Sequence, residues 1–339
     1  MSHSLFNVHL NTQDKHYECA QDDSILEAGL RHGLSMRYEC SNGTCGACKA
    51  KLTQGTIKPI KHHDYALSQE AQEQGEFLTC CYAPETDVSL DIELIGDVRS
   101  IPQQQIETKV KQVQLLGDMA ILTLRTPRSK TLQFMAGQDV VLSYQGLSSR
   151  YPIASCPCQG MELEFHIRHL EDDAFSQALF QTAIKPKTKI ELDGPRGVFV
   201  LNETSTRPMV FIAWDGGFAP IRSLIEHAFS LEMTQEVQLY WAYPEAEDKP
   251  YFDNHAQAWH QVLDEYQYHA IGCQFDRSNQ NDCHQVARQI LQALDLDLIK
   301  RAQVYIAAPA ELLIYLSELL LEEGLNETQL IGSPTWSKY

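Results

Sequence analysis

The spacing of three cysteines near the N-terminus constrains this chain more than any other feature. Cys40, Cys45 and Cys48 follow the pattern C-x4-C-x2-C in a stretch of small residues, and Cys80 is the most plausible fourth ligand further along the chain. Four cysteine thiolates at such spacing are typical of a plant-type [2Fe-2S] cluster. Glycines within the stretch would let backbone N–H groups approach the cluster sulfurs.

Zinc bound through Cys45 and Cys48 is the alternative metal site. Zinc sites usually add a second C-x2-C pair or a histidine pair, whereas the distal cysteines Cys80 and Cys81 are adjacent. The spacing therefore favours iron and sulfur. The other six cysteines are expected to be free thiols: Cys19, Cys81, Cys156, Cys158, Cys273 and Cys283. The pair around Pro157 resembles a redox pair only loosely, because one intervening residue strains a disulfide.

Length and charge narrow the possible classes. A chain of 339 residues is long enough for two or three domains, each with its own core. A net charge of -18 argues against binding to nucleic acid or to anionic membranes, which requires an excess of Lys and Arg. The first residues, Met1 to Phe6, show neither a basic region nor a long apolar run, so we expect a cytoplasmic protein.

Residues 1–98 are predicted to form a small α+β domain, similar to a β-grasp, around the cluster loop. Apolar and polar residues alternate over 5–10 and 16–20, which predicts a hairpin. Ser24 and Glu27 form a capping box that predicts the start of a short helix. Later strand-like runs are residues 48–52, 77–80 and 88–94.

Residues 103–203 are predicted to form an antiparallel β-barrel, because short strand-like runs are separated by turn signals. A polar, proline-containing segment at 100–105 indicates a linker before it. One helix is expected at 174–183. The six predicted strands are 108–115, 120–125, 138–144, 150–155, 162–168 and 189–192.

Residues 206–339 alternate between strands and helices, which predicts a doubly wound parallel sheet. Pro220 is expected at the first position of the first helix, and Gly324 closes the last one. Ligands bind such sheets at the carboxyl ends of the strands. The strands are expected at 209–213, 237–241, 268–271 and 304–307, and the helices at 220–232, 255–264, 284–294 and 310–323.

An iron-sulfur domain, a barrel and a nucleotide-type α/β domain in this order resemble the ferredoxin-NADP reductase superfamily, in its branch with an N-terminal plant-type ferredoxin domain. The resemblance covers about residues 5–332. It implies that hydride passes from NAD(P)H to FAD, and that single electrons then pass through the cluster to a separate protein. A flavin is needed because a two-electron donor cannot reduce a one-electron cluster directly. The resemblance is strongest in residues 40–52, 77–80, 134–138, 164–168, 194–199 and 217–221.

The resemblance implies a flavin site on two barrel strands, with Tyr151 packed on the flavin ring in the catalytic position. The family fingerprint is R-x-Y-S, whereas here Arg150 directly precedes the tyrosine and Pro152 replaces the serine. Asp172 and Asp173 stand where the family has glycines, at a helix start that would hold the pyrophosphate. The expected flavin-binding residues are Ser149, Arg150, Tyr151, Pro152, Ile153, His166, Ile167, Arg168, Phe175 and Ser176.

The expected nicotinamide site departs from the family in three places. Trp214 and Asp215 replace glycines where a phosphate or ribose should pass, and Ala307 and Ala308 replace a Cys-Gly pair. The strand around residue 241 lacks the arginine that would pair with a 2′-phosphate, which favours NADH over NADPH. Three residues are expected to border this cleft: Gly216, Gly217 and Pro220.

Two functions follow from these patterns. One is an NADH-dependent flavin and iron-sulfur reductase that serves a protein acceptor, such as an oxygenase or dehydratase component, docking near the cluster. The other is an electron-relay or partner-binding protein whose nicotinamide site has decayed. The retained glycine turn before a helix favours the reductase.

Overall fold

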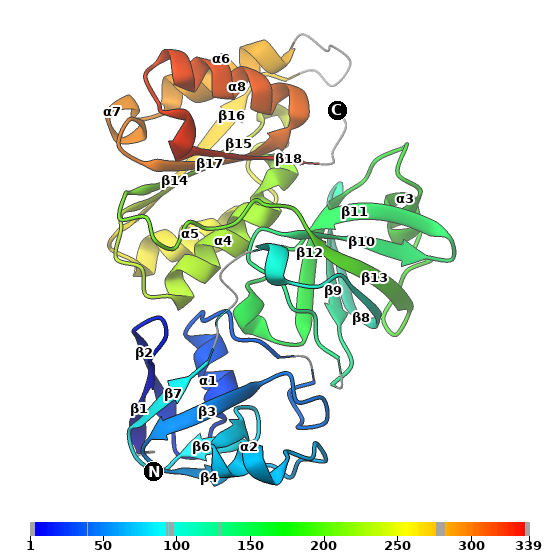
Figure 1. The fold of residues 1–339 in the computed structure, drawn as a ribbon. Coiled ribbons are helices and arrows are strands. Elements are labelled where there is room, and N and C mark those ends of the chain that lie inside the picture. Colours follow the sequence, from blue (N-terminus) through cyan, green and yellow to red (C-terminus); the bar gives the residue numbers. More distant parts are fainter. Residues whose placement is uncertain are drawn as a thin grey trace.

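The computed structural model describes residues 4–38, 40–92, 94, 98–128, 130–275 and 282–335. Three main sheets follow one another along the chain, and Figure 1 shows the N-terminal unit below the other two. Residues 1–3 and 336–339, at the ends of the predicted first and third domains, lie outside the described residues, as does Glu93 in the run 88–94. Within the described ranges, no helix is both long and apolar enough to cross a membrane.

The N-terminal unit is a five-stranded sheet in the order β2-β1-β7-β3-β5. The predicted hairpin and short helix are confirmed, and the Ser24 side chain accepts the Glu27 N–H at 3.1 Å. The elements are β1 Leu5–Leu10, β2 Lys15–Ala20, α1 Ile25–Arg31, β3 Lys49–Gln54, β4 Ile57–Pro59, α2 Gln69–Glu73, β5 Glu76–Leu78, β6 Tyr82–Pro84 and β7 Val88–Asp91.

The second unit is the predicted antiparallel barrel, with strand order β11-β10-β13-β8-β9-β12. Its edge strands meet just past β11, where the Ala154 N–H donates to the Glu164 carbonyl at 2.8 Å. The predicted linker is shorter than expected, because Gln104 already belongs to β8. The elements are β8 Gln104–Leu116, β9 Met119–Arg125, β10 Asp139–Tyr144, β11 Leu147–Pro152, the 3-10 turn η2 Pro157–Gln159, β12 Glu162–Arg168, α3 Ala174–Phe180 and β13 Lys189–Arg196.

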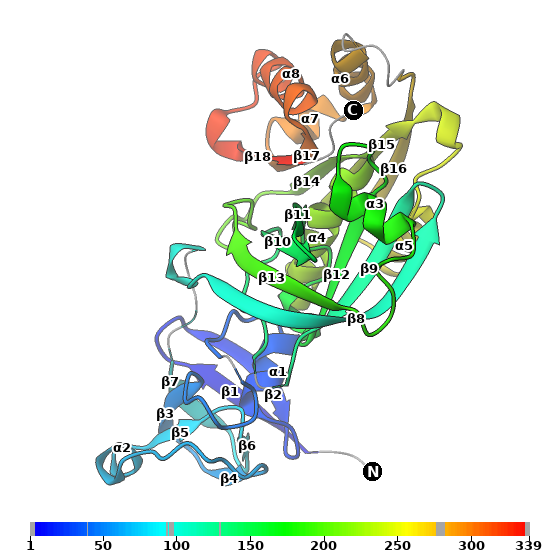
Figure 2. The same ribbon diagram turned by 90° about the vertical axis from the view of Figure 1, so that its right-hand side faces the viewer.

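The third unit is a parallel sheet in the order β16-β15-β14-β17-β18. The predicted doubly wound architecture is confirmed, since α4 and α5 lie on one side of the sheet and α6 and α8 on the other (Figures 1 and 2). The elements are β14 Met209–Trp214, η3 Asp215–Gly217, α4 Phe218–Ser230, β15 Val237–Pro244, η4 Glu245–Glu247, α5 Asp253–Val262, β16 Tyr266–Cys273, α6 Asp282–Ala293, α7 Leu296–Ile299, β17 Gln303–Pro309, α8 Ala310–Glu322 and β18 Leu330–Thr335.

The predictions for the start of α4 and for two of the cysteines are wrong. Helix α4 begins at Phe218, so Pro220 is its third residue and not its first, because the turn η3 runs directly into the helix. Proline is still tolerated there, since first-turn N–H groups have no partner within the helix. Cys156 and Cys158 are not free thiols but form a disulfide. The turn η2 brings their Cα atoms to 5.2 Å, within the ordinary range for a disulfide.

The carboxyl ends of β14 and β17 form the switch point of the third sheet, where the chain reverses its direction of winding. Gly217 packs against β17 at this point. A Cβ atom on Gly217 would lie only 2.1 Å from the Ala307 carbonyl oxygen. The close approach of the two backbones therefore requires glycine at this position.

Replacing Gly217 with alanine should destabilise this unit by about 1–3 kcal/mol, because the Ala307 backbone would have to move. Gly216→Ala is the matched control. A Cβ there would meet only the Met119 Cε at 3.5 Å, so we expect a change within about 0.5 kcal/mol. All four tryptophans follow residue 206, so urea unfolding monitored by tryptophan fluorescence reports on this unit. Equal stability of the two variants would contradict the steric argument.

Candidate functional site

The structure brings the four predicted cluster cysteines together, with a fifth beside them. The Sγ atoms of Cys48 and Cys80 are 3.2 Å apart, and the Cys80 and Cys81 sulfurs are 3.5 Å apart. Cys40 and Cys45 are close enough for each side chain to shift the pKa of the other. The gathering of these thiols suits a cluster of two irons held by four cysteines. The sequence pattern did not single out Cys81 as a member of this group.

The backbone around these cysteines supplies N–H donors to sulfur. The Thr44 N–H lies 3.4 Å from the Cys40 Sγ, and the Ala47 N–H lies 3.4 Å from the Cys45 Sγ. Burial opposes ionisation of Cys40, but hydrogen bonds from Asn42, Thr44 and Cys45 lower its pKa to about 6. Burial raises the pKa of Cys45, and the hydrogen bond with Cys80 followed by burial raises that of Cys48. The backbone N–H groups directed at sulfur fit an iron-sulfur cluster, whose ligands are thiolates.

Two glycines make the cluster loop compact. Gly43 and Gly46 have φ angles of +80° and +76°, a region that other residues rarely adopt. A Cβ on Gly46 would meet the Tyr65 ring at 2.3 Å, and one on Gly43 would meet the Cys81 Sγ at 2.6 Å. The loop is thus packed tightly over the thiols. Its outer surface carries the exposed residues Asn42 and Thr44.

The second candidate site is a cavity of about 40 Å³ between the barrel and the α/β unit. The residues that line it include Tyr151, Pro152, His166, Arg168, Asp173 and Gly216. Tyr151 is only 7% exposed, and its hydroxyl donates to the Asp173 carboxylate. Burial, and then the charge of Asp173, raise the pKa of Tyr151. The structure thus brings the expected flavin-stacking tyrosine next to the expected nicotinamide turn.

Asp173 occupies the start of α3, where the pyrophosphate was expected. Its carboxylate accepts the Phe175 N–H at 3.0 Å and the Ser176 N–H at 3.2 Å. It also accepts the Ser149 hydroxyl at 2.7 Å. An N-cap carboxylate of this kind stabilises a helix, and it also competes with any other anion for the same donors.

The other predicted flavin residues divide between the two faces of their strands. Arg150 forms an ion pair with Asp139 and is not among the residues that line the cavity. Ile153 and Ile167 are buried in the barrel core. Arg150 stands one residue later than the arginine of the family fingerprint. Because successive side chains of a strand point to opposite faces, this shift accounts for its absence from the cavity that Tyr151 lines.

Arg168 is buried between the barrel and the α/β unit. Its guanidinium pairs with Asp215 and with Glu247, the latter at 3.2 Å. Although burial opposes its charge, these two carboxylates raise the pKa of Arg168. The positive charge on the cavity wall is thus balanced by acidic side chains of this same chain.

Trp214 does not stand in the expected path of a dinucleotide. Its side chain is 4% exposed and lies in the core under α6 and α8, with its ring edge-to-face on Phe275 at 5.2 Å between centroids. Asp215 adopts a φ of +49°, its carboxylate reaches Arg168, and its carbonyl accepts the Trp241 indole N–H at 3.0 Å. The backbone of Gly216 is therefore what the turn presents to the cavity.

Serine substitutions at the adjacent cysteines test the fourth ligand. We expect Cys80→Ser to lose most of its iron and visible absorbance, because Cys80 is the sulfur that contacts Cys48. Cys81→Ser is the matched control and should retain both. Iron content and the electron paramagnetic resonance spectrum of the reduced protein measure the outcome. Loss of iron in Cys81→Ser alone would reverse the assignment.

Comparison with known proteins agrees with this geometry. The family described as "2Fe-2S iron-sulfur cluster binding domain" matches residues 8–85, and "Oxidoreductase FAD-binding domain" matches residues 108–201. The chain is 30% identical over 254 residues to the CDP-6-deoxy-L-threo-D-glycero-4-hexulose-3-dehydrase reductase of Yersinia pestis, covering 75% of each chain. It is 27% identical over 236 residues to reductase component 1 of the Comamonas terephthalate 1,2-dioxygenase, covering 69% of each.

Among solved structures, the Amycolatopsis cytochrome P450 reductase GcoB has a similar fold. The TM-score is 0.60 at 21% identity, over 97% of this chain and 98% of that one. The chain therefore belongs to the ferredoxin-NADP reductase superfamily, in the branch with an N-terminal plant-type [2Fe-2S] ferredoxin domain, and is an oxidoreductase that transfers electrons through FAD and an iron-sulfur cluster.

Proposed function

We propose that this oxidoreductase takes electrons from NADH in the cytoplasm and delivers them to a separate protein that docks near the Cys40–Cys48 loop. The observation that carries the proposal is the cavity in which Tyr151 of the barrel meets Gly216 of the switch point. A flavin and a nicotinamide bound there would lie against each other. FAD supplies the conversion between a two-electron donor and a one-electron cluster.

The choice of NADH rests on charge. The turn η4 after β15 carries Glu245 and Glu247, and Asp248 follows it. Glu247 and Asp215 both pair with Arg168, the cationic side chain of the cavity wall. A 2′-phosphate in this region would face carboxylates and an arginine whose charge is already balanced. The hydroxyl of NADH meets no such repulsion.

Binding of FAD requires a change at Asp173. The cavity of about 40 Å³ is smaller than a flavin ring system, and the hydrogen bond from Tyr151 to Asp173 lies on its wall. We assign Tyr151 to stacking on the ring and the N–H groups of Phe175 and Ser176 to the pyrophosphate. Asp173 holds those N–H groups, so it has to yield them when the cofactor enters.

The names of the relatives support one class of protein as the electron acceptor. Their names describe reductases of a dehydrase and reductase components of a dioxygenase and of a monooxygenase. A protein component of this kind is therefore the proposed acceptor here. We propose that it docks on the face of the cluster loop where Asn42 and Thr44 are exposed.

Anaerobic titration of the cofactor-loaded protein tests the electron donor. We expect NADH to bleach the flavin and cluster absorbance, and NADPH to require at least about tenfold higher concentration, because its 2′-phosphate would face the carboxylates of Glu245, Glu247 and Asp248. Dithionite reduction is the control that both cofactors are redox-active. Bleaching by dithionite but not by millimolar NADH would instead support a relay protein without a working nicotinamide site.

The variant Asp173→Asn tests the pyrophosphate site. Asparagine still caps a helix, but it removes a negative charge close to the expected phosphates. Repulsion of about 1 kcal/mol in water, and more when buried, predicts that FAD binds at least about fivefold more tightly to the variant. Asp172→Asn, at the exposed neighbouring position, should change the affinity less. Fluorescence titration of the flavin-free protein measures both. Weaker binding by Asp173→Asn would place the pyrophosphate elsewhere.

A further inference from the structure

The Cys156–Cys158 disulfide has no role in the proposed transfer of electrons from NADH through FAD to the cluster. Only Pro157 separates its cysteines, so it closes a very short loop. A disulfide stabilises a fold mainly by restricting the unfolded chain, and a short loop gives little such restriction. In a reducing compartment such as the cytoplasm, where we place this protein, disulfides are rare and are usually catalytic or redox-sensing. Stability therefore does not account for this bond.

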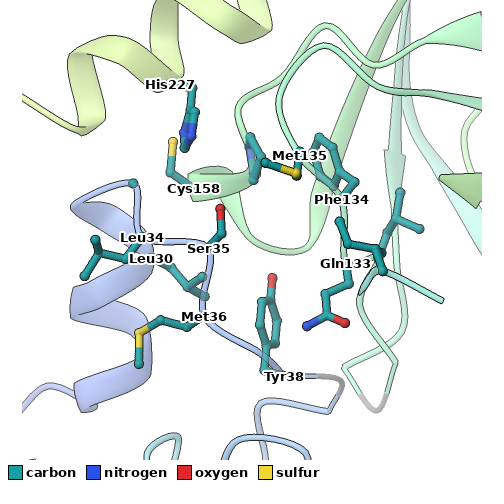
Figure 3. A pocket seen from close by; sticks show the side chains of 14 residues that line it. Leu30, Leu34, Ser35, Met36, Tyr38, Gln133, Phe134, Met135, Cys158 and His227 are labelled. Atoms are coloured by element: carbon teal, nitrogen blue, oxygen red, sulfur yellow. The ribbon is translucent and has the colours of Figure 1, made fainter. Parts of the chain in front are cut away.

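The disulfide lies where all three units meet. The turn η2, which contains Cys158, packs against α1 of the iron-sulfur unit and against α4 of the α/β unit. Cys158 lines a narrow cavity of about 20 Å³ together with Gly33, Met36, Phe134 and His227, and Figure 3 shows His227 directed from α4 toward Cys158. Any change at this bond therefore takes place at the contact between the units.

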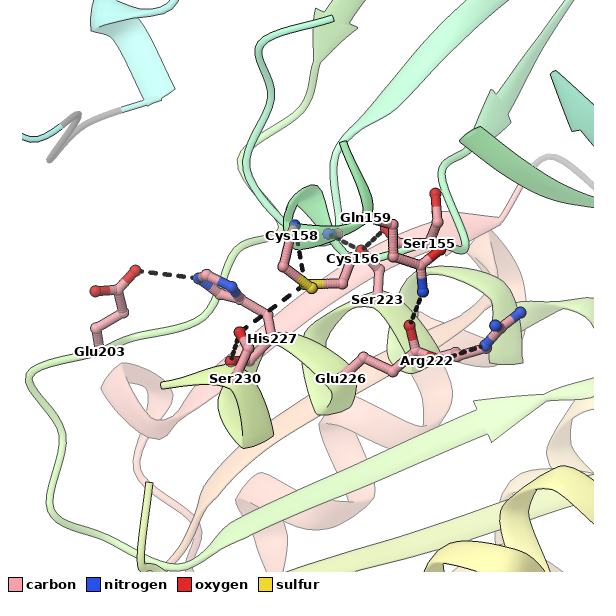
Figure 4. Close-up of a disulfide and its surroundings, with 11 residues drawn as sticks. Ser155, Cys156, Cys158, Gln159, Glu203, Arg222, Ser223, Glu226, His227 and Ser230 are labelled. Atoms are coloured by element: carbon pink, nitrogen blue, oxygen red, sulfur yellow. Dashed lines mark hydrogen bonds and ion pairs between the residues drawn. A yellow bond between two sulfur atoms is a disulfide. The ribbon is translucent and has the colours of Figure 1, made fainter. Parts of the chain in front are cut away.

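The two sulfurs differ in exposure and in hydrogen bonding, so they have different roles in thiol exchange. Cys158 is partly exposed, whereas Cys156 is 1% exposed. The Cys156 Sγ accepts the Cys158 N–H at 3.2 Å, and the Ser230 Oγ lies 3.9 Å away with its own proton donated to the His227 carbonyl (Figure 4). A hydrogen-bond donor at a sulfur stabilises it as a departing thiolate. Cys158 is thus the accessible sulfur and Cys156 the leaving group.

His227 provides a proton acceptor for the reduced state. Its ring is 3% exposed, and its Nε2 lies 3.3 Å from the Glu203 Oε1. The carboxylate only accepts, so Nε2 carries a proton, and in the neutral form of the ring the Nδ1 atom holds a lone pair. That buried Nδ1 has no hydrogen-bond partner among the described residues. An S–H group formed by reduction of the disulfide would give the His227 Nδ1 a hydrogen-bond donor.

We propose that Cys156 and Cys158 form a reversible dithiol–disulfide centre that exchanges with a dithiol at the junction of the three units. A thiolate of the dithiol attacks the Cys158 Sγ, a bond forms between these sulfurs, and Cys156 leaves as a thiolate. The second thiol of the reductant then displaces Cys158. Two electrons and two protons pass to the protein, and the reductant becomes a disulfide.

Redox titration of the holoprotein tests the proposal. The full chain with its cluster and FAD is equilibrated anaerobically in mixtures of reduced and oxidised dithiothreitol, alkylated while folded, and digested for mass spectrometry. We expect Cys156 and Cys158 to be unlabelled in protein purified without thiols, labelled together after reduction, and protected again after reoxidation. Labelling before any reduction, or labelling only after denaturation, would overturn the proposal. This readout does not depend on NADH, so it is separate from the proposed electron donor.

Variants at His227 and Glu203 test the proton acceptor. His227→Leu removes the acceptor that the reduced thiol would use, so the equilibrium should shift about tenfold toward the disulfide. Glu203→Gln is the conservative control, because its side-chain oxygen can still accept the Nε2–H and hold the ring. It should leave the equilibrium within about twofold of the wild type. An unchanged equilibrium in His227→Leu would overturn the role of this histidine.

Discussion

Strand β12 connects the barrel to the α/β unit through a row of buried polar side chains. Glu164, His166 and Arg168 alternate with core residues and so point to one face of the strand. Glu164 pairs with Arg222 of α4, the His166 Nδ1 lies 2.8 Å from the Tyr251 hydroxyl, and Arg168 pairs with Asp215. Removing one partner of a buried ion pair costs about 3–5 kcal/mol. These contacts fix the two units relative to each other, and with them the cavity between Tyr151 and Gly216.

The same contacts determine how the cavity can bind an anion. Arg168 is balanced by two carboxylates and Arg150 by Asp139, so neither guanidinium is available without breaking an ion pair. Backbone N–H groups at the η3 turn, and those at the start of α3 once Asp173 releases them, are other donors near this cavity. Backbone N–H groups can bind a dinucleotide only where the backbone comes close to its phosphates.

Most of the fold follows from local patterns in the sequence. Alternating runs and capping signals predict the hairpin at β1 and β2, the barrel strands and the helices of the α/β unit, because each depends on neighbouring residues. The direction of single side chains does not follow in this way. Trp214 was expected to obstruct the cofactor path, but the left-handed conformation of Asp215 redirects the chain so that Trp214 remains in the core. The Cys156–Cys158 bond was missed because it depends on the 3-10 turn between the two cysteines.

The candidate cluster site and the candidate flavin and nicotinamide site differ in how their residues are distributed along the chain. The cluster ligands come mostly from one loop, so their spacing alone indicates the metal. The predicted flavin and nicotinamide residues lie on or beside β11, β12, α3 and η3, which only the fold brings together. The iron-sulfur unit must also lie near the flavin, and it packs on the other two units at the cavity lined by Met36 and Phe134. This three-way contact contains residues from every unit and appears in no single motif.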